Sequence, residues 1–289
     1  MKDRFEYIFF IGFSYLFRLL RLRLSRKFST VLAFIFFYVI PIRKKTTIDN
    51  LTKAFPEYSP QMIKKISFNS YKSFAVVLIE ILSLPCISKK KIKELVKFEE
   101  VENVKNKYNE GKGVILLAAH FGNWEYSGIA GGLVFGHPFS IIVKPQRNNL
   151  VSEWLNKMRT KWGNEVIPLG ISIRQVYKAL KDGKIVAMAA DQRGSAEGIR
   201  VNFFGRKASV YPGPAMLSLK TGAPLFCGIS IRQPDYSYVT KFVEVDLNNL
   251  PESEEDKVIE ISQRLTDYLE NIIREHPEQW LWMHKRWKY

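Results

Sequence analysis

The stretch Gly113-Val-Ile-Leu-Leu-Ala-Ala-His-Phe-Gly-Asn-Trp-Glu-Tyr-Ser-Gly128 decides the fold. Residues 114–119 form an unbroken apolar run of strand length, which is typical of a strand covered on both faces of a sheet. The run stops at His120, Gly122 permits a tight turn, and Asn123 is a favoured N-cap for a helix directly behind it. The stretch therefore predicts a strand, a turn and a helix in direct succession.

His120 and Glu125 lie on either side of this expected turn. Open α/β sheets bind their ligands in the crevice at the carboxyl ends of the strands, so both side chains are expected to face a substrate. A neighbouring carboxylate accepts the Nδ1–H of an imidazole, fixes its tautomer and stabilises the imidazolium that forms. We therefore predict that His120 is a general base and that Glu125 orients it. Two structural alternatives stay open, a buried histidine and a helix-dipole role for Glu125.

The segment His120-Phe-Gly-Asn-Trp-Glu125 resembles the His-x4-acid motif of the lysophospholipid acyltransferase superfamily, in the form used by the bacterial lipid A late acyltransferases. Other segments resemble the same family in the same order, over roughly residues 28–287. They are Asn50-Leu51, Ala54-Phe-Pro-Glu57, the loop Lys144-Pro-Gln-Arg-Asn-Asn149, Val201-Asn-Phe-Phe-Gly-Arg206, Pro212-Gly-Pro-Ala-Met-Leu217 and the tail from Pro277.

This resemblance implies an enzyme that moves a fatty acyl chain from an acyl carrier protein thioester to a hydroxyl of a lipid A precursor. It places the reaction at the cytoplasmic face of the bacterial inner membrane, with no cofactor and no acyl-enzyme. Because the loop 144–149 differs from the form in the best-known members, another glycolipid or an amino-lipid stays open as the acceptor. The implied partners are acyl carrier protein, the lipid A precursor or a related glycolipid, and anionic membrane lipids.

Several residues around the motif are expected to bind substrate. Lys144 and Arg147 lie in a loop that leaves a strand, and an arginine fork suits a phosphate or a carboxylate. The resemblance implies that these groups, with Arg159 on the following helix, hold the head of the acceptor. Asn123 and Trp124 lie inside the motif and are included in the same set. The alternative is a solvated basic loop followed by an ordinary amphipathic helix.

A second polar cluster follows the apolar run 185–190, where Asp191 and Arg193 stand. In a parallel sheet, a helical crossover brings this strand end near His120. Asp191 could then orient an acceptor amine or hydroxyl, and an ion pair with Arg193 is the alternative. The oxyanion of the reaction is expected to be stabilised by backbone N–H groups near Gly122 or by an arginine.

The charge balance indicates an anionic partner. The 289-residue chain holds 44 Lys+Arg and 28 Asp+Glu, a net charge of +16. Residues 1–45 hold ten basic and two acidic residues, so +8 of that charge lies among aromatic and aliphatic side chains. This interleaving favours an anionic membrane surface over nucleic acid. A basic membrane-associated binding protein is the alternative that is not an enzyme.

Two apolar runs, residues 7–17 and 28–42, are separated by a basic cluster, namely Arg18, Arg21, Arg23, Arg26 and Lys27. The first run is too short to cross about 30 Å of hydrocarbon, and the second is borderline. We predict helices that lie in the cytoplasmic leaflet with the basic side chains at headgroup level. A span by the second run stays open, and so does a buried hairpin, which would need acidic partners that the nearby sequence lacks. The predicted domains are membrane-anchoring helices, 1–45, and an acyltransferase α/β domain, 46–289.

The rest of the chain alternates between strand and helix patterns. Further apolar runs of strand length are 139–143, 185–190, 225–231 and 238–245. Ser59 and Ser172 are expected to cap helices. We therefore predict an α/β fold with a mixed, largely parallel central sheet flanked by helices. Cys86 and Cys227 lie far apart and the four histidines form no His-Glu-x-x-His motif, so no disulfide framework and no metal site are expected.

Overall fold

A computed structural model of the chain describes residues 1–170 and 173–288, with a seven-stranded sheet of order β1-β9-β8-β2-β5-β3-β4 at its centre. Strands β2, β3, β4, β5 and β8 run parallel to one another, whereas β9 is antiparallel to β8 and β1 is parallel to β9. The prediction of a mixed, largely parallel sheet is therefore confirmed. The strands are β1 (Val96–Glu99), β2 (Val114–Ala118), β3 (Phe139–Val143), β4 (Glu165–Pro168), β5 (Ile185–Ala189), β8 (Leu225–Arg232) and β9 (Tyr238–Glu244), with a separate antiparallel hairpin of β6 (Ile199–Phe203) and β7 (Arg206–Val210).

Strand β2 lies in the interior of the sheet, and all five of its residues are apolar. It pairs with β5 on one side and β8 on the other. Ile115 and Leu117 pack into the core on one face, and Val114 and Leu116 pack into the core on the opposite face. A strand that is covered on both faces gains free energy from apolar burial at every position, which explains the unbroken apolar run.

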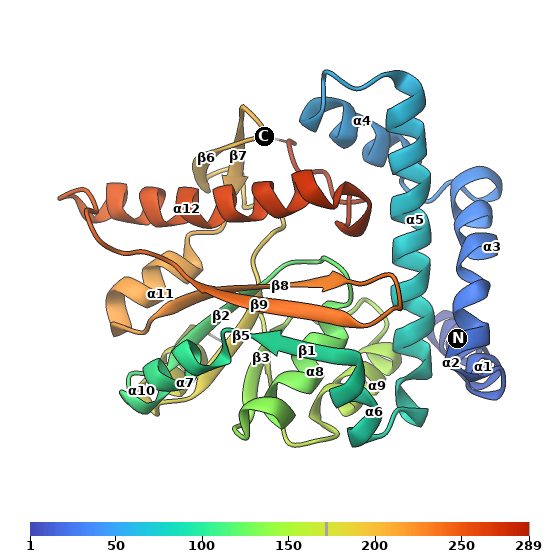
Figure 1. Cartoon of the computed structure of the whole chain (residues 1–289), viewed down its shortest axis with the longest axis horizontal. Coiled ribbons are helices and arrows are strands. Elements are labelled where there is room, and N and C mark those ends of the chain that lie inside the picture. Colours follow the sequence, from blue (N-terminus) through green and yellow to red (C-terminus); the bar gives the residue numbers. More distant parts are fainter. Residues whose placement is uncertain (171–172, 289) are drawn as a thin grey trace.

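Helices cover both faces of the sheet, and Figure 1 shows α12 on one side of β8 and β9, with α7 and α8 on the other. The helices of the α/β region are α4 (Lys44–Ala54), α5 (Pro60–Ser83), α6 (Lys89–Leu95), α7 (Val101–Asn109), α8 (Trp124–Phe135), α9 (Asn149–Thr160), α10 (Ile173–Lys181), α11 (Gly213–Thr221) and α12 (Glu254–Glu275), with short 3-10 turns η2 (Leu84–Cys86) and η3 (Pro277–Gln279). Val176, Leu217 and Ile261 bring α10, α11 and α12 onto one face. Val104 and Phe135 bring α7 and α8 onto the other.

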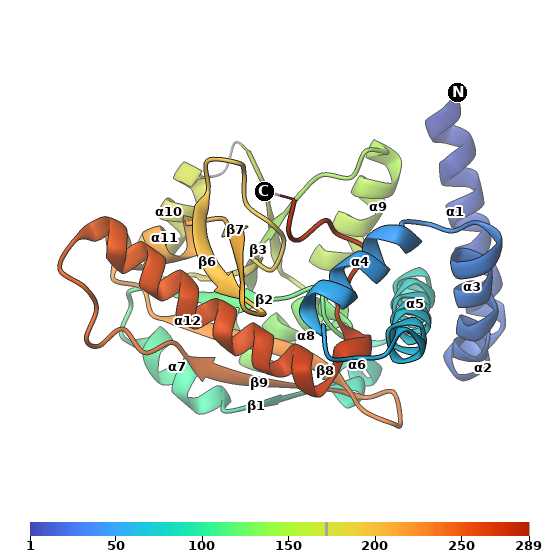
Figure 2. The ribbon, with the colours of Figure 1, turned by 90° about the horizontal axis from the view of Figure 1, so that it is seen from above.

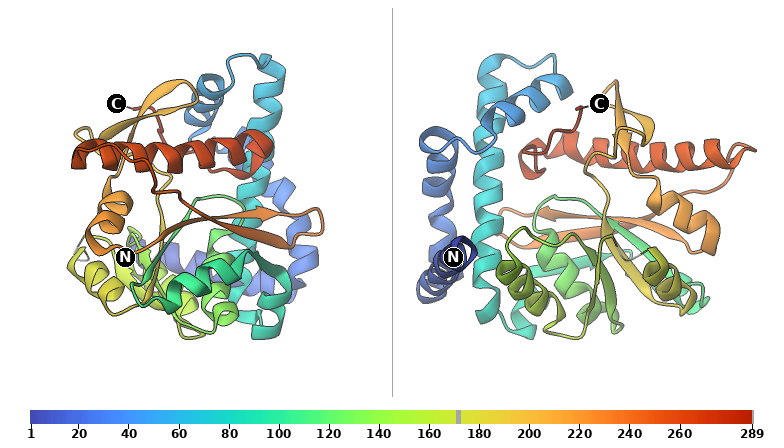
Figure 3. Two further views of the ribbon diagram at one scale, coloured as in Figure 1. Left: turned by 60° about the vertical axis from the view of Figure 1, so that its left-hand side comes forward. Right: turned by 180° about the vertical axis from the view of Figure 1, so that it is seen from behind.

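The N-terminal helices form a layer outside α5. They are α1 (Lys2–Leu19), α2 (Arg21–Lys27) and α3 (Ser29–Phe34), the last continued by the π-helical turn η1 (Ile35–Val39). Figure 2, seen from above, and Figure 3 show this layer on the side of α5 that faces away from the sheet. Within residues 1–170 and 173–288, no helix taken singly has the length and apolar composition of a membrane span. One pair, Arg21–Val39 and Lys44–Ala54, reaches them together but is bent by 96°. The predicted domain boundary at residue 45 stays a prediction.

One part of the N-terminal prediction is corrected by the structure. Arg26, expected at headgroup level, is only 8% exposed and pairs with Glu80 of α5, with 2.6 Å between Nη2 and Oε1. This acidic partner is 54 positions away in the sequence, so no local charge pattern reveals it. The outer face of α1 is apolar and open, with Phe5 61% and Phe9 69% exposed.

Two further outcomes concern element boundaries. The Ser59 side chain accepts a hydrogen bond from the Met62 N–H at 3.2 Å, which confirms the predicted cap of α5. Residue 172, the other predicted cap, lies outside the described residues. Strands β1 and β4 were not predicted, because their four-residue segments mix charged and apolar residues without a clear period. Both are edge strands of the sheet, where burial on two faces is not required.

Candidate active site

The turn between β2 and α8 is held by the C-terminal tail. The Gly122 N–H donates to the Gln279 carbonyl at 3.2 Å, and the Leu281 N–H donates to the His120 carbonyl at 3.0 Å. Gly122 has φ +52°, and a Cβ atom there would clash with the Ser230 carbonyl oxygen. Because only glycine fits this conformation and this space, the turn has one tight path, and that path sets the direction of His120.

His120 pairs with Asp191 at the ends of two neighbouring strands. Its Nδ1 is 2.7 Å from Asp191 Oδ1, and its backbone N–H donates to Asp191 Oδ2 at 2.9 Å. The indole N–H of Trp280 donates to the same Oδ2 at 2.8 Å. Strand register explains the meeting: β2 and β5 are parallel with Ala118 opposite Ala189, so the residues two positions beyond each come side by side.

This pairing corrects the predicted orienter of His120. Asp191, not Glu125, accepts the Nδ1–H, a role that was not among those predicted for Asp191. Glu125 lies in the first turn of α8 and receives the guanidinium of Arg159, with Nε–Oε2 at 2.9 Å and Nη2–Oε1 at 2.5 Å. The two side chains are 12% and 9% exposed, so this is a nearly buried bidentate ion pair.

Arg159 is likewise placed differently from the prediction that it holds the acceptor head. In addition to its two bonds to Glu125, its Nη1 donates to the Asn156 Oδ1 at 2.9 Å. Burial tends to lower the pKa of Arg159, but the hydrogen bonds and charge of Glu125 outweigh burial and raise it. The guanidinium of Arg159 on α9 is therefore held by Glu125 on α8.

The His120 and Asp191 side chains shift each other's ionisation. Burial tends to lower the pKa of His120, but the charge of Asp191, its hydrogen bond and the charge of Glu125 outweigh burial and raise the pKa above 6.5. Burial tends to raise the pKa of Asp191, yet the charge and hydrogen bonds of His120, with the bond from Trp280, lower it. Both shifts favour an imidazolium beside a carboxylate, the state that a general base reaches after it has taken a proton.

Asn123 and Trp124 have different surroundings. The Asn123 side chain is fully buried: its Nδ2 donates to Glu80 Oε2 at 2.7 Å, and its Oδ1 accepts from the Tyr126 N–H at 3.0 Å. Both ends of the amide are thus engaged inside the protein, and Asn123 supports the turn instead of contacting a substrate. The Trp124 ring lies edge-on to His120, with centroids 5.0 Å apart, and forms one wall beside the imidazole.

The basic residues predicted to bind substrate lie in two places. Lys144 and Arg147 are exposed, and Arg147 forms an ion pair with Glu6 of α1, with 2.6 Å between Nη2 and Oε1. Arg193 lies two residues after Asp191. Its positive charge reaches His284 in the C-terminal tail, where burial and Arg193 are the two largest causes that lower the pKa of His284 to about 4. The substrate-binding roles of Lys144, Arg147 and Arg193 stay predictions.

Three of the backbone N–H groups that could have stabilised the oxyanion are already engaged. The backbone N–H groups of His120, Phe121 and Gly122 all donate to groups inside the protein, namely Asp191, Ala119 and Gln279. An arginine, the other stabiliser expected from the sequence, stays a prediction. Among residues 1–170 and 173–288, no group of three or more His, Cys, Asp or Glu side chains is arranged to hold a metal ion.

Two residues of the tail belong to the site and were not predicted. Trp280 donates to Asp191, and Arg286 lies with Asp191 at the wall of a largely apolar cavity of about 50 Å³ between the sheet, α11 and α12. Burial lowers the pKa of Arg286 to about 10, so it stays protonated at neutral pH. The only signal in the sequence was weak, a tail rich in tryptophan and basic residues whose packing partner was unknown.

The arrangement suits proton transfer to and from a substrate at the carboxyl ends of β2 and β5. The His120 side chain is 23% exposed, whereas that of Asp191 is 3% exposed. With Nδ1 committed to Asp191, Nε2 is the nitrogen left to accept a proton from outside. A buried carboxylate behind a partly exposed imidazole is the general-base arrangement of acyl-transfer sites, here without a serine or cysteine between imidazole and substrate.

Comparison with known proteins identifies related enzymes of acyl transfer. The sequence model of a family described as bacterial lipid A biosynthesis acyltransferase matches residues 3–289. The chain is 25% identical to a lipid A biosynthesis palmitoleoyltransferase of Escherichia coli (strain K12) over 248 residues, 85% of this chain and 79% of that protein. It is 24% identical to a lipid A biosynthesis lauroyltransferase of the same strain over 250 residues, 85% and 79% of the two chains.

The similarity also reaches enzymes with another lipid in their name. The chain is 24% identical to a phosphatidylinositol mannoside acyltransferase of Mycolicibacterium smegmatis (strain ATCC 700084 / mc(2)155) over 222 residues, 75% of this chain and 71% of that protein. All three relatives are named for acyl transfer to a glycolipid or within its biosynthesis.

Proposed function

The chain belongs to the bacterial lipid A biosynthesis acyltransferase family, and on that premise we propose that it transfers a fatty acyl chain from an acyl carrier protein thioester to a hydroxyl of a lipid A precursor. The observation that carries the proposal is the His120–Asp191 pair at the carboxyl ends of β2 and β5. A lipid hydroxyl keeps its proton at neutral pH and is therefore a weak nucleophile toward a thioester. A positioned imidazole accepts that proton during the attack and makes the oxygen more nucleophilic.

In the proposed reaction, His120 Nε2 takes the proton of the acceptor hydroxyl while its oxygen attacks the thioester carbonyl. Asp191 holds the Nδ1–H and stabilises the imidazolium. When the tetrahedral intermediate collapses, the C–S bond breaks and the imidazolium returns the proton to the leaving thiolate. The new ester and the free thiol are the products. Donor and acceptor must be bound together, because the acyl group passes directly from one to the other.

The acidic carrier protein and an anionic lipid acceptor both fit the charge of the chain. A net charge of +16 attracts anions to the surface and speeds their encounter with it. Three arginines, Arg193, Arg43 and Arg286, contribute positive charge at His284, a residue that also senses the charge of Asp191. We propose that phosphate groups of the acceptor bind on this side of the site. A phosphatidylinositol mannoside is a second candidate acceptor class, because mycobacterial relatives are named for it.

The function is tested by mass spectrometry of lipid A from a strain that lacks the gene. Loss of one acyl chain, restored by the wild-type gene, is the expected result. An unchanged acyl number in lipid A would contradict the lipid A acceptor. The same extracts, analysed for other glycolipids and for amino-lipids, would then identify the class that has lost an acyl chain.

We also propose that the N-terminal helices seat the enzyme on the cytoplasmic face of the inner membrane. The support is one face of α1 on which apolar side chains recur at helical spacing, with Phe5, Phe9 and Leu16 all exposed. Basic residues of the same segment, other than Arg26, can meet anionic headgroups. Such a face gains free energy when acyl chains of a bilayer cover it.

The double variant Phe5→Glu/Phe9→Glu is expected to lower the partition coefficient onto anionic liposomes by at least about tenfold, because each phenylalanine loses its apolar burial in the bilayer. Flotation of the purified protein with vesicles measures the change. Met216→Glu is the control, since Met216 is 37% exposed on α11, which Figure 2 shows on the side of the molecule opposite to α1. Equal flotation of both variants would contradict α1 as the contact.

A further inference from the structure

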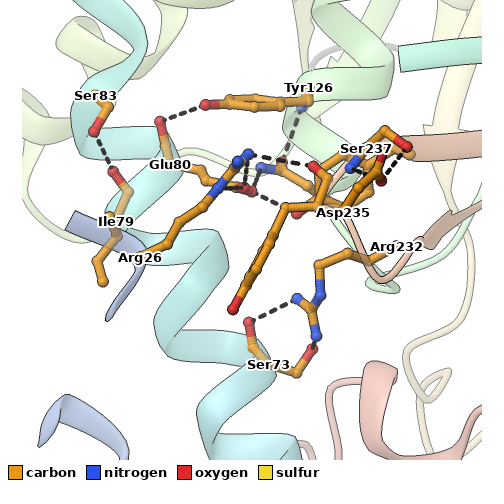
Figure 4. Close-up of polar contacts among 12 residues, drawn as sticks. Arg26, Ser73, Ile79, Glu80, Ser83, Tyr126, Arg232, Asp235 and Ser237 are labelled. Carbon is orange, nitrogen blue, oxygen red and sulfur yellow. Dashed lines mark hydrogen bonds and ion pairs between the residues drawn. The ribbon is translucent and has the colours of Figure 1, made fainter. Parts of the chain in front are cut away.

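A buried carboxylate on α5 lies directly behind the catalytic turn. The Glu80 side chain is fully buried, and its two oxygen atoms accept from three side chains of different elements. Oε1 receives Arg26 Nε at 2.8 Å, whereas Oε2 receives Asn123 Nδ2 at 2.7 Å and the Tyr238 hydroxyl at 2.5 Å. Figure 4 shows Arg26 and Glu80 meeting between α5 and the start of α8.

Asn123 carries this contact into the active site. It stands three residues after His120 and two before Glu125, at the N-cap of α8. The bond from Nδ2 to Glu80 fixes which way the amide is turned, so that Oδ1 faces the Tyr126 N–H and caps the helix. The Tyr126 hydroxyl in turn donates to the Glu80 backbone carbonyl at 3.2 Å. The start of α8 is thus attached to α5 at two points.

Arg26 links the same cluster to the N-terminal layer. It belongs to α2, and its Nη2 also donates to the Tyr236 carbonyl at 3.3 Å, with the guanidinium 4.9 Å from the Tyr236 ring centroid. One arginine therefore joins α2, α5 and the β8–β9 hairpin. The outer neighbours of α2 are the apolar helices that we propose to contact the bilayer.

A buried ion pair is a costly way to stabilise a fold. Removing two charges from water costs several kcal/mol per ion, and apolar residues of similar volume often replace such a pair without loss of stability. What an apolar pair cannot do is accept the Asn123 and Tyr238 hydrogen bonds in fixed directions. The chemistry of this cluster therefore points to positioning more than to stability.

We propose that Glu80, held by Arg26, is a positioning residue for acyl transfer that keeps Asn123, and through it the His120 turn, in the reactive geometry. The proposal rests on the proposed function, which it deepens. It gives the N-terminal layer a second role, because α2 not only belongs to the anchoring layer but also supplies a side chain that supports the active-site turn from behind.

Two double variants that differ in one property test this inference. Arg26→Gln/Glu80→Gln removes both charges but keeps an amide oxygen for Asn123, whereas Arg26→Met/Glu80→Leu removes the acceptor as well. Both are expected to fold. Transfer from acyl carrier protein to a lipid A precursor in micelles should keep most of its kcat in the Gln/Gln variant. In the Met/Leu variant kcat should fall between about tenfold and about 10²-fold, with KM unchanged, because the turn is displaced and binding is not.

Asn123→Ser is the second test, because serine keeps a cap oxygen for α8, whereas its shorter side chain lacks the Nδ2 group that donates to Glu80. It should lower kcat to a similar extent, and it decides the matter if the Met/Leu variant does not fold. Ser14→Ala is the matched control: the Ser14 hydroxyl joins α1 to α5 through the Leu82 carbonyl at 2.7 Å without touching the turn. Its kcat should equal that of the wild type.

A titration of the His120 imidazole by NMR separates this inference from the proposed function, since it needs no substrate. The pKa of His120 should be lower in the Met/Leu and Asn123→Ser variants than in the Gln/Gln variant, because a displaced turn weakens the bond to Asp191. Equal His120 pKa values in folded variants would overturn the positioning role. No transfer by the wild-type protein, with the pKa difference present, would count against the acceptor or donor alone.

Discussion

The His120→Ala variant is expected to lose acyl transfer almost completely, with kcat lower by about 10⁴-fold. The physical reason is that no other imidazole takes the place of His120 beside Asp191: His284, near the same carboxylate, has its pKa lowered to about 4 by burial and neighbouring arginines, which makes it a poor base. Transfer of a labelled acyl group from acyl carrier protein to the lipid acceptor measures the loss.

The controls for His120→Ala are cooperative thermal unfolding, which shows that the variant is folded, and flotation with anionic liposomes, which should match the wild type. The imidazole is partly exposed and its removal leaves the apolar face of α1 untouched. If the variant transferred acyl groups as fast as the wild type, the base would lie elsewhere. If neither protein transferred acyl groups and both floated with liposomes, the chain would be a basic membrane-associated binding protein.

Asp191→Asn is expected to lower kcat by about 10³-fold, and Glu125→Gln by much less. An asparagine at position 191 is isosteric but cannot stabilise the imidazolium, and its amide can favour the wrong tautomer of His120. Glu125 makes no hydrogen bond to the imidazole; its carboxylate is committed to Arg159, so its charge acts on His120 from a distance. Measured kcat values for the two variants rank the two acids. The opposite order would restore Glu125 as the orienter.

The pH dependence follows from the same pair. A general base must be neutral, so kcat/KM should fall as the pH drops through the His120 pKa, and this limb should lie above pH 6.5 because Asp191 raises that pKa. In Asp191→Asn the limb should move to lower pH. Stability has the opposite sense: the contribution of the His120 titration is fully present below pH 6.5 and is lost as the pH rises through the raised pKa of His120. The contribution of Asp191, whose pKa is lowered, is present above pH 3.8 and is lost as the pH falls through that lowered pKa.

Local pattern was enough to predict the strand, the turn and the helix around His120, because each depends on residues close in the sequence. The apolar run 114–119, Gly122 and the N-cap Asn123 are found where the pattern placed them. The same reasoning assigned Glu125 to His120 because it lies five residues away, and it placed Asp191 nearby only as a residue that orients the acceptor. The parallel register of β2 and β5 brings Asp191 closer, although it is 71 positions away.

Charge reasoning for the whole chain stays a prediction, and for one residue it was wrong. Composition and the basic N-terminus favour an anionic membrane, and the exposed apolar face of α1 is consistent with that interpretation. Arg26 was grouped with its basic neighbours, because helix periodicity does not say what packs against each side. Its partner Glu80 sits in an apolar stretch of α5 whose pattern is that of an ordinary buried helix.

The sequence by itself determined the α/β class, the strand–turn–helix segment that carries His120, and the family, because these rest on patterns and motifs within short segments of chain. The tertiary structure alone decided which acid serves His120, why Arg159 is held by Glu125, and how Arg26 and the C-terminal tail reach the site. Each of these depends on strand register or on packing between distant elements. A linear order of residues leaves such contacts unspecified until the chain has folded.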